Sequence, residues 1–408
     1  MSMPWYGELP KRWEEVRNKW LFTEAYERNE KTEAPLLSFS RSKGLIPFQD
    51  KGNRTLQSDD LTKYRIVRRG QLLINRMQAW SGMFIYVDKY GCVSPDYSVF
   101  NANKNVCVKY YEYLFRTPLM VEKFANASKG VGDGFNRLYT PQFYEIRVIH
   151  PPRDEQEQIV RYLDWKVSGI NRLINAKRRQ IGLLQEQKHI TIKSAFRNTE
   201  NCKKCKLKNL AFFKSGTNLT SLEIEPAGNY PVYGGNGLRG YYSNFSHSGQ
   251  YLLIGRQGAL CGNVHYVNEK FWATEHAITV KPNDIAHIKW LYYLLIDMNL
   301  NQYSMAAAQP GISVEYIINI PTYFPPYNEQ QSIANHLDNK CANIDKVINK
   351  LNEEITLFTE YRTRLISDVV TGKLDVCGVV VPEFEAVEDV VGDEEVEEEE
   401  STKEYEID

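Results

Sequence analysis

The sequence has 408 residues, 42% hydrophobic and 25% charged, an ordinary composition for a globular protein long enough for two or three domains. Its formal net charge of −1 is uneven: fourteen acidic residues and one lysine between Glu383 and Asp408 leave +12 on residues 1–382, which suits an anionic partner, nucleic acid first. No run of 18 apolar residues and no apolar leader occur, so we expect neither a membrane span nor secretion.

The cysteines argue for a cytoplasmic protein without a metal site. The chain has seven, scattered and odd in number, as is typical of free thiols in a reducing compartment. Cys202 and Cys205 form a CxxC motif, but no second pair lies at zinc-finger spacing, and the seven histidines show no ligand spacing. We therefore expect no bound metal.

Residues 1–150 are predicted to form a β-rich globular domain, because short strand-like runs alternate with Gly, Asn and Tyr. The segment INRMQAWSGMFIYV (74–87) matches IGRQGALCGNVHYV (254–267) at six of fourteen positions. This second copy lies within residues 206–324, which we therefore expect to form a second β-rich domain of the same kind.

A stronger repeat follows each domain. Residues 151–186 and 325–360 share 14 identities in 36 positions without a gap, starting with a double proline in both copies. The prolines are expected to end a strand and open a helix, with Asp154 and Asn328 as N-cap residues. A period of 174 residues is far too long for a solenoid and indicates a duplicated domain pair.

Each repeat then continues with apolar residues at intervals of three, four and seven. Such a narrow stripe over about five heptads is typical of a coiled-coil seam rather than of a globular core face. We predict helices from about Gln156 to Lys193 and from about Gln330 to Ser367, each roughly 55 Å long at 1.5 Å per residue. They fall within two predicted helical spacers, residues 151–205 and 325–376, and their similar seams are expected to bury each other.

The chain ends in an acidic segment, residues 377–408, which is predicted to be a disordered tail. It either acts as a solubilising extension or competes with DNA for the basic surface. The fold class expected for the whole is α+β, with two β-rich globular domains separated by two long helices in a pseudo-twofold arrangement.

Two motifs that suggest an enzyme lack their structural context, and a third is missing from the sequence. FPPY (324–327) resembles the (D/N)PPY loop of amino-methyltransferases, but Phe324 cannot accept a hydrogen bond from a base. GNGLRG (235–240) fits GxGxxG, but the next residues do not continue as a helix, so its glycines are expected to shape turns. No GxxxxGK[ST] phosphate loop is present. No catalytic residue is predicted.

In order and duplication, these segments resemble the specificity (S, HsdS-type) subunit of type I restriction–modification systems. The family's two conserved helical regions are similar to the segments PP..EQ..I...LD.K...I..LI of this chain. The end of the family's second helix is similar to RLISDVVTGKLDV. NRMQAWSG…GCVSPDYSVF and YPVYGGNGLRGYY…LIGRQGALCGNV…FWATEHAITV resemble the bodies of two target-recognition domains, and AAAQPGISVEYIINIPTYFPP the exit from the second. The resemblance covers the chain except the tail after Val376.

The resemblance implies a non-catalytic subunit that binds no cofactor itself. Each target-recognition domain would read half of a bipartite double-stranded DNA site, and an antiparallel helix pair would set the spacer. The implied partners are modification subunits, two in number, which use S-adenosylmethionine to methylate adenine, and restriction subunits, which use ATP and Mg, in a phage-defence system. Half-sites one helical turn apart require about 34 Å between the reading heads.

DNA-contacting residues are expected to be Arg, Lys, Asn and Gln on loops. Arg76 and Arg256 are equivalent in the repeat, so a structural role in a turn common to both domains, or phosphate binding, competes with base reading for this pair. Tyr97 and His276 are expected either to stack or to pack. The candidates are Arg41, Lys43, Arg76, Gln78, Lys129 and Arg137 in the first domain, and Lys214, Asn236, Arg239, Arg256, Gln257 and Gln309 in the second.

Three other functions compete with this reading. A self-contained methyltransferase or nuclease would bind a cofactor, and the missing loops argue against it. A coiled-coil scaffold that binds only protein leaves the basic body unexplained and predicts no salt-dependent DNA binding. A related alternative, compatible with the sequence, is a solitary specificity subunit that exchanges into another system's complex.

Overall fold

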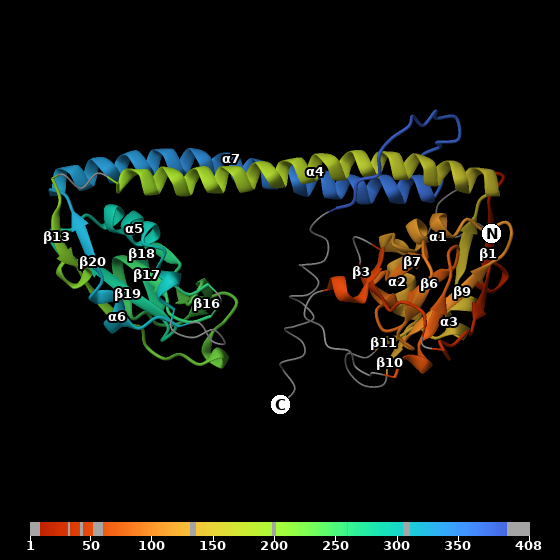
Figure 1. The fold of residues 1–408 in the computed structure, drawn as a ribbon, viewed down its shortest axis with the longest axis horizontal. Helices are drawn as coiled ribbons and strands as arrows, with labels where there is room; N and C mark the ends of the chain where they lie inside the picture. The colour runs from red at the N-terminus through yellow and green to blue at the C-terminus, as the bar shows by residue number, and fades with distance from the viewer. Residues whose placement is uncertain are drawn as a thin grey trace. The chain divides into compact units, whose positions relative to one another are not determined.

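The computed structural model describes residues 9–31, 33–40, 44–51, 60–130, 136–197, 201–258, 260–304 and 311–389. The chain divides into two compact units (Figure 1). Unit 1 comprises residues 1–179 and 352–408, and unit 2 comprises residues 180–351. Each unit contains one globular domain and one part of both long helices, α4 and α7.

The globular domain of unit 1 is built on a four-stranded antiparallel sheet of order β2-β9-β6-β7, which α1, α2 and α3 cover. Its strands are β1 (Glu14–Arg17), β2 (Phe22–Ala25), β3 (Leu37–Ser40), β4 (Gly44–Pro47), β5 (Arg65–Val67), β6 (Leu72–Asn75), β7 (Phe84–Tyr86), β8 (Gly91–Val93), β9 (Tyr97–Ala102), β10 (Lys129–Gly130), β11 (Asn136–Arg137) and β12 (Arg147–His150). Its helices are α1 (Val108–Phe115), α2 (Pro118–Ala127) and α3 (Thr140–Glu145), with short 3-10 turns between elements.

The core of unit 1 is aromatic and includes the long helices. Phe115 packs edge-on against both Phe84 and Phe143, and Phe84 and Phe143 are stacked. The same core takes in Leu163 from α4 and Val369 from α7, both fully buried. The globular domain and the helix pair of this unit therefore share one hydrophobic core.

Unit 2 is built on a six-stranded sheet of order β14-β19-β17-β18-β15-β16. Helix α5 covers one face with Trp290, Leu291 and Leu295 over the buried side chains of β17 and β19. The strands are β13 (Lys203–Lys206), β14 (Ala211–Ser215), β15 (Tyr230–Gly234), β16 (Gly237–Tyr242), β17 (His247–Gly255), β18 (Val264–Ala273), β19 (Ala277–Pro282) and β20 (Pro321–Phe324), and the short helices are α5 (Ile288–Asp297) and α6 (Val314–Ile318).

The two predicted long helices are present as α4 (Arg153–Ala195) and α7 (Tyr327–Val370), and both pass through both units. They run antiparallel within each unit. In unit 1, Asn171 of α4 bonds Arg362 of α7 and Lys177 bonds Glu354. In unit 2, Lys188 bonds Asp345 at 2.7 Å, and Ile192 packs on Leu337 and Cys341.

A buried glutamine attaches each globular domain to its long helix in the same way. Gln156 Oε1 accepts from the Cys107 backbone N–H at 2.8 Å, and its Nε2 donates to the Pro151 and Asn105 carbonyls at 2.7 and 3.2 Å. The equivalent Gln330 accepts from the His287 N–H at 2.8 Å and donates to the Pro325 and Ile285 carbonyls, both at 2.9 Å. Both side chains are fully buried, so each amide satisfies backbone groups that water cannot reach.

An aspartate eight residues after each glutamine makes a second pair of equivalent contacts. Asp164 accepts from Tyr113 Oη at 2.8 Å and from Lys109 Nζ at 2.7 Å, both on α1. Asp338 accepts from Tyr293 Oη at 2.7 Å and lies 3.6 Å from Lys289 Nζ, both on α5. Two polar identities of the sequence repeat, the glutamine and the aspartate, therefore join each globular domain to its long helix.

The structure corrects three details of the sequence reading. Asp154 and Asn328 are not N-caps, because α4 begins at Arg153 and α7 at Tyr327, which places both residues in the first turn. β13 begins at Lys203, within the range predicted as the first spacer, and pairs with β20. Residues 377–389, expected as the start of a disordered tail, make defined contacts with α4 instead; the remainder of that tail lies outside the described residues.

Two expectations about local structure were confirmed, the place of the double prolines and the turn at GNGLRG. Each double proline stands between a strand and a long helix, and GNGLRG spans the β15–β16 hairpin, where Gly237 has a φ of 95°. Within the described ranges, no helix is both long and apolar enough to cross a membrane, and no three His, Cys, Asp or Glu side chains gather as a metal site requires.

Candidate nucleic-acid interface

In unit 1 the candidate residues gather at the loop after β6. The guanidinium of Arg76 donates through Nε to the Asp96 carbonyl at 2.9 Å and through Nη2 to the Pro95 carbonyl at 2.7 Å. Gln78 Oε1 accepts from Asn75 Nδ2 at 2.9 Å and so shapes the same loop. These contacts support the structural alternative for Arg76, which holds the turn before β9.

The β10–β11 hairpin places two more candidates beside this loop. Lys129 pairs with Arg137 across the hairpin, and the Leu138 N–H bonds the Arg76 carbonyl at 3.1 Å. Lys129 is exposed, and Arg137 is half-buried with its Nε 2.7 Å from the sulfur of Met77. The hairpin lies at the end of unit 1 opposite α4 (Figure 1).

The charge at this end of unit 1 is concentrated. Burial lowers the pKa of Arg76, and the positive charges of Arg65 and Arg137 lower it further, whereas Asp96 and Glu24 act in the opposite direction. Glu24 is itself engaged, with Arg65 at 3.1 Å. Three guanidinium groups therefore share two carboxylates, an arrangement that favours an incoming anion such as a phosphate.

Arg256 occupies the equivalent place in unit 2. Its N–H bonds the His276 carbonyl at 2.8 Å and its carbonyl accepts from the Ile312 N–H at 2.9 Å, as Arg76 does with Asp96 and Leu138. The side chain differs: Arg256 Nη1 reaches Ser215 Oγ at 3.4 Å. The backbone junction is thus common to both domains, and the guanidinium contacts are specific to each.

Several exposed polar groups surround Arg256. His276 Nδ1 and Gln257 Oε1 are 2.7 Å apart, and His276 Nε2 lies 3.1 Å from Glu275. Asn236, at the tip of the β15–β16 hairpin, accepts from Asn263 at 3.2 Å. Amide and imidazole groups of this kind can present both donors and acceptors to base edges.

The stem of Arg239 packs across Gly234, where an added Cβ would come within 2.4 Å of its Cδ. Arg239 is an exposed residue of β16, on the same hairpin as Asn236. The glycine hairpin thus carries two of the candidate side chains on a backbone that leaves no room for a larger residue.

Replacing Gly255 with Ala is expected to lower the free energy of unfolding of unit 2 by about 3 kcal/mol, because the added Cβ would lie 1.9 Å from the Gly235 carbonyl oxygen. Urea unfolding, monitored by hydrogen exchange, would measure this loss of stability. Gly182→Ala is the control: its site on α4 is exposed and open, so it should stabilise by about 1 kcal/mol. Equal stability of Gly255→Ala and wild type would contradict the close approach.

Four candidates are not part of these clusters as described. Lys214 precedes Ser215 on β14, and strand alternation turns its side chain to the opposite face, where its charge adds to burial in lowering the pKa of His247. Arg41, Lys43 and Gln309 lie outside the described residues. Of the two undecided aromatic residues, Tyr97 packs against the core of unit 1, and His276 is bonded at the surface.

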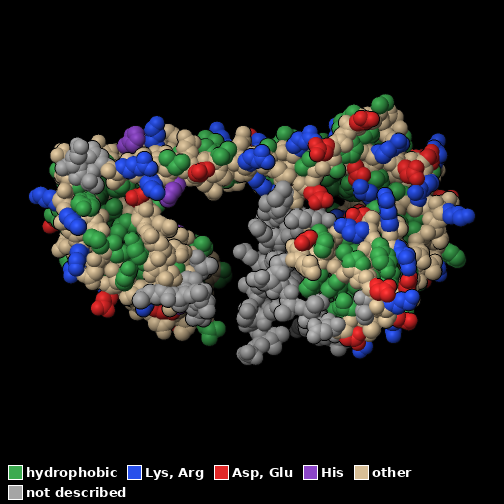
Figure 2. Space-filling view, viewed as in Figure 1, with side chains coloured by type: hydrophobic (Ala, Val, Ile, Leu, Met, Phe, Trp, Pro, Cys, Tyr) green, Lys and Arg blue, Asp and Glu red, His purple; other side chains and the backbone are tan. Residues whose placement is uncertain are grey.

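Sequence reasoning missed a second basic surface. β13 and the turn after it expose Lys203, Lys204, Lys206 and Lys208, and Figure 2 shows Lys and Arg side chains along this edge of unit 2. The equivalent strand of unit 1 is β1, which pairs with β12 as β13 pairs with β20, yet it carries Glu14 and Glu15. The run KKCKLK could have signalled this patch. Exposed Trp80 and Tyr139 near the unit 1 candidates were also not foreseen.

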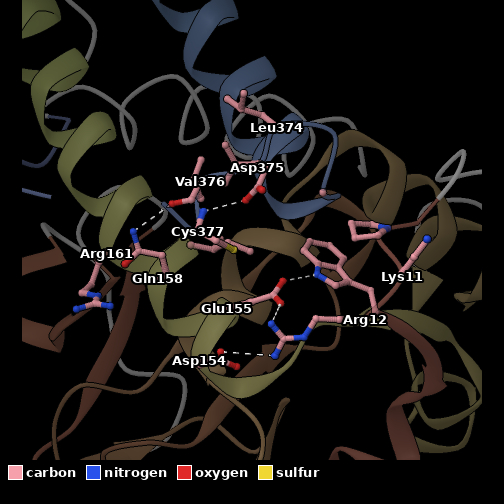
Figure 3. A pocket seen from close by; sticks show the side chains of 15 residues that line it. Lys11, Arg12, Asp154, Glu155, Gln158, Arg161, Leu374, Asp375, Val376 and Cys377 are labelled. Atoms are coloured by element: carbon pink, nitrogen blue, oxygen red, sulfur yellow. Dashed lines mark hydrogen bonds and ion pairs between the residues drawn. The ribbon is translucent and has the colours of Figure 1, made fainter. Parts of the chain in front are cut away.

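A pocket of about 600 Å³ lies within unit 1, between the N-terminal residues, the first turns of α4 and the chain that follows α7 (Figure 3). Glu155 accepts from Trp13 Nε1 at 2.7 Å and pairs with Arg12 at 3.0 Å. Gln158 reaches the Val376 carbonyl at 3.1 Å. These contacts fasten the N-terminal segment and the end of α7 to α4, which is a structural role.

Comparison with known proteins gives a consistent picture. Residues 10–182 and 199–357 match the family described as type I restriction modification DNA specificity domain. The type I restriction enzyme EcoprrI specificity subunit of Escherichia coli is 44% identical over 124 residues, which is 30% of each chain. A putative type I specificity subunit of Mycoplasma pneumoniae is 30% identical over 146 residues, 34% of this chain and 46% of that protein.

These alignments therefore span less than half of the relatives' own lengths. A solved structure from a study of complex assembly and conformational transition of the type I R-M system covers 90% of this chain and 100% of its own. Its TM-score is 0.62 at 16% identity, a likeness of fold.

Proposed function

Because this chain belongs to the family of type I restriction modification DNA specificity domains, we propose that it is the sequence-recognition subunit of a type I restriction–modification complex. The observation that carries the proposal is the duplicated joint: Gln156 with Asp164, and Gln330 with Asp338, attach two equivalent domains to the long helices by the same bonds. A protein that reads one bipartite DNA site needs two such reading domains.

Within this proposal, each domain reads one half-site through its basic loops. The loops around Arg76 and Arg256 occupy equivalent backbone junctions, and each carries exposed Lys, Arg, Asn or Gln nearby. α4 and α7 form the antiparallel coiled-coil spacer and give the molecule its pseudo-twofold symmetry. The spacing of the half-sites then follows from helix length.

The chain itself carries no catalysis in this proposal. Two modification subunits supply S-adenosylmethionine-dependent adenine methylation, and restriction subunits supply ATP- and Mg-dependent cleavage. The separation of roles is supported by the candidate residues, which are suited to binding a nucleic acid and include no activated nucleophile. The complex is proposed to act in the cytoplasm.

Single-base methylation mapping tests the proposal in cells that carry this chain with its modification partner, beside cells from which this chain alone is deleted. We expect a bipartite adenine-methylated motif with a constant spacer in the first cells only. A motif that persists without the chain, or one that is short and undivided, would remove the specificity role and leave the protein-binding scaffold as the explanation.

A further inference from the structure

The chain that follows α7 turns back and runs along α4 in unit 1. Its first attachment is Gln158, whose Nε2 donates to the Val376 carbonyl at 3.1 Å (Figure 3). The same Nε2 donates to the Val379 carbonyl at 2.7 Å. Beyond it, Val380 is 88% exposed and Phe384 is 39% exposed, whereas Val381 is partly buried against the core of unit 1. A second attachment follows.

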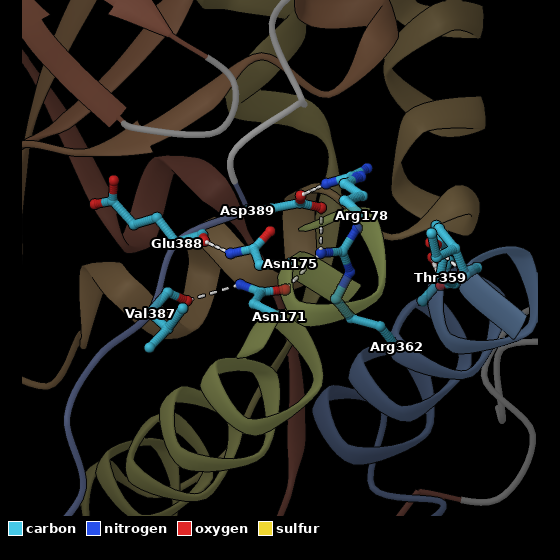
Figure 4. Close-up of polar contacts among 10 residues, drawn as sticks. Asn171, Asn175, Arg178, Thr359, Arg362, Val387, Glu388 and Asp389 are labelled. Carbon is cyan, nitrogen blue, oxygen red and sulfur yellow. Dashed lines mark hydrogen bonds and ion pairs between the residues drawn. The ribbon is translucent and has the colours of Figure 1, made fainter. Parts of the chain in front are cut away.

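The second attachment consists of hydrogen bonds to the backbone of an extended segment, residues 385–389, here called the strap. Asn171 Nδ2 donates to the Val387 carbonyl at 2.9 Å and Asn175 Nδ2 to the Glu388 carbonyl at 2.9 Å (Figure 4). The Val387 N–H donates to Ser168 Oγ at 3.3 Å. Positions 168, 171 and 175 lie on one face of α4, because they are three and four residues apart.

The strap ends in a carboxylate that both long helices hold. Asp389 bonds Arg178 of α4 and, at 2.8 Å, Arg362 of α7, and Arg362 also donates to Asn171 Oδ1 at 2.6 Å. Figure 4 shows the Asp389 carboxylate between the two guanidinium groups. Burial raises the pKa of Asp389, but the hydrogen bonds from Arg362 and Arg178 outweigh it and hold the pKa below its ordinary value.

These residues have the chemistry of a peptide-binding groove. Ser168 and Asn171 are only 7% and 6% exposed in the presence of the strap, so their polar groups are satisfied by a peptide backbone rather than by water. Hydrogen bonds to the peptide backbone do not depend on the identity of its side chains, whereas the two arginines select a carboxylate at one position. Without that carboxylate, Arg178 and Arg362 would repel each other.

We propose that Ser168, Asn171, Asn175, Arg178 and Arg362 form a docking groove for an extended acidic peptide, and that the strap occupies it as an internal ligand. A partner that presents an extended segment with a carboxylate at the Asp389 position would displace the strap. Because the strap is tethered, its effective concentration is on the order of millimolar, which keeps the groove self-occupied. The proposal does not depend on DNA recognition.

The test uses the full chain and a fluorescein-labelled peptide of residues 383–389 (EFEAVED), with binding followed by fluorescence anisotropy. Asp389→Arg places a third cation between Arg178 and Arg362 and should release the strap. We expect this variant to bind the peptide at least tenfold more tightly than the wild-type chain. Adding Arg362→Gln to the same variant, or replacing the last residue of the peptide with Asn, should reverse the gain.

Glu383→Arg is the matched control, since it makes the same charge change at an exposed residue before the strap and should leave peptide binding as in wild type. Hydrogen exchange at the Val387 amide reports strap release directly. Release without tighter peptide binding overturns the docking groove. Continued protection of Val387 in Asp389→Arg overturns the recognition of the carboxylate. Neither result touches methylation specificity, so failure here is distinct from failure of the proposed function.

Discussion

Replacing Gln156 with Leu is expected to lower the free energy of unfolding of unit 1 by about 3 kcal/mol. Leu fills nearly the same volume, but it leaves the Cys107 N–H and the Pro151 and Asn105 carbonyls without the partners that the fully buried amide supplies. Urea unfolding monitored by hydrogen exchange, read separately for peptides of α1 and α5, would measure the loss in each unit.

Gln330→Leu should have the same effect on unit 2, because it removes the bonds to His287, Ile285 and Pro325. Gln185→Leu on an exposed face of α4 is the matched control and should change stability by less than about 0.5 kcal/mol. If Gln156→Leu unfolded at the wild-type urea concentration, the joint would not depend on this amide. If either substitution loosened both units equally, the two joints would not be independent.

The double substitution Lys129→Gln with Arg137→Gln is expected to weaken DNA binding about tenfold near 0.1 M salt and to reduce the slope of log K against log salt by about 2. Both residues belong to the β10–β11 hairpin beside Arg76, and neither holds an ion pair that would be lost elsewhere among the described contacts. A salt titration of the full chain with its modification partner on labelled duplex would measure both quantities.

The control is the double substitution Lys104→Gln with Arg153→Gln, which removes the same charge from unit 1. Both residues lie outside the loop after β6 and the β10–β11 hairpin, and Arg153 is at the start of α4. It should leave the slope within about 0.5 of wild type. A loss of affinity with an unchanged slope would mean that the hairpin contacts bases rather than phosphates. Equal effects of the two double variants would mean that only net charge matters and that the hairpin is not an interface.

The sequence by itself determined the two long helices of this protein and their duplication. Periodicity and the double prolines located α4 and α7 to within three residues at each end, because a long amphipathic helix depends on local pattern. The faint match around Arg76 and Arg256 identified a true common feature, the backbone junction with Asp96 and with His276. The turn role of the GNGLRG glycines was likewise readable, since a turn is a local structure.

Only the tertiary structure decided what the repeated polar residues do. Gln156 and Asp164 are polar residues of a predicted helix, and their partners, Cys107 and Tyr113, are about 50 residues away in the chain. The same holds for the strap: its composition indicates disorder, but Asn171, Arg178 and Arg362 lie more than 25 residues from Asp389 and supply the bonds that order it. Periodicity reports which face of an element is buried. It does not report which groups from distant parts of the chain form hydrogen bonds with that face.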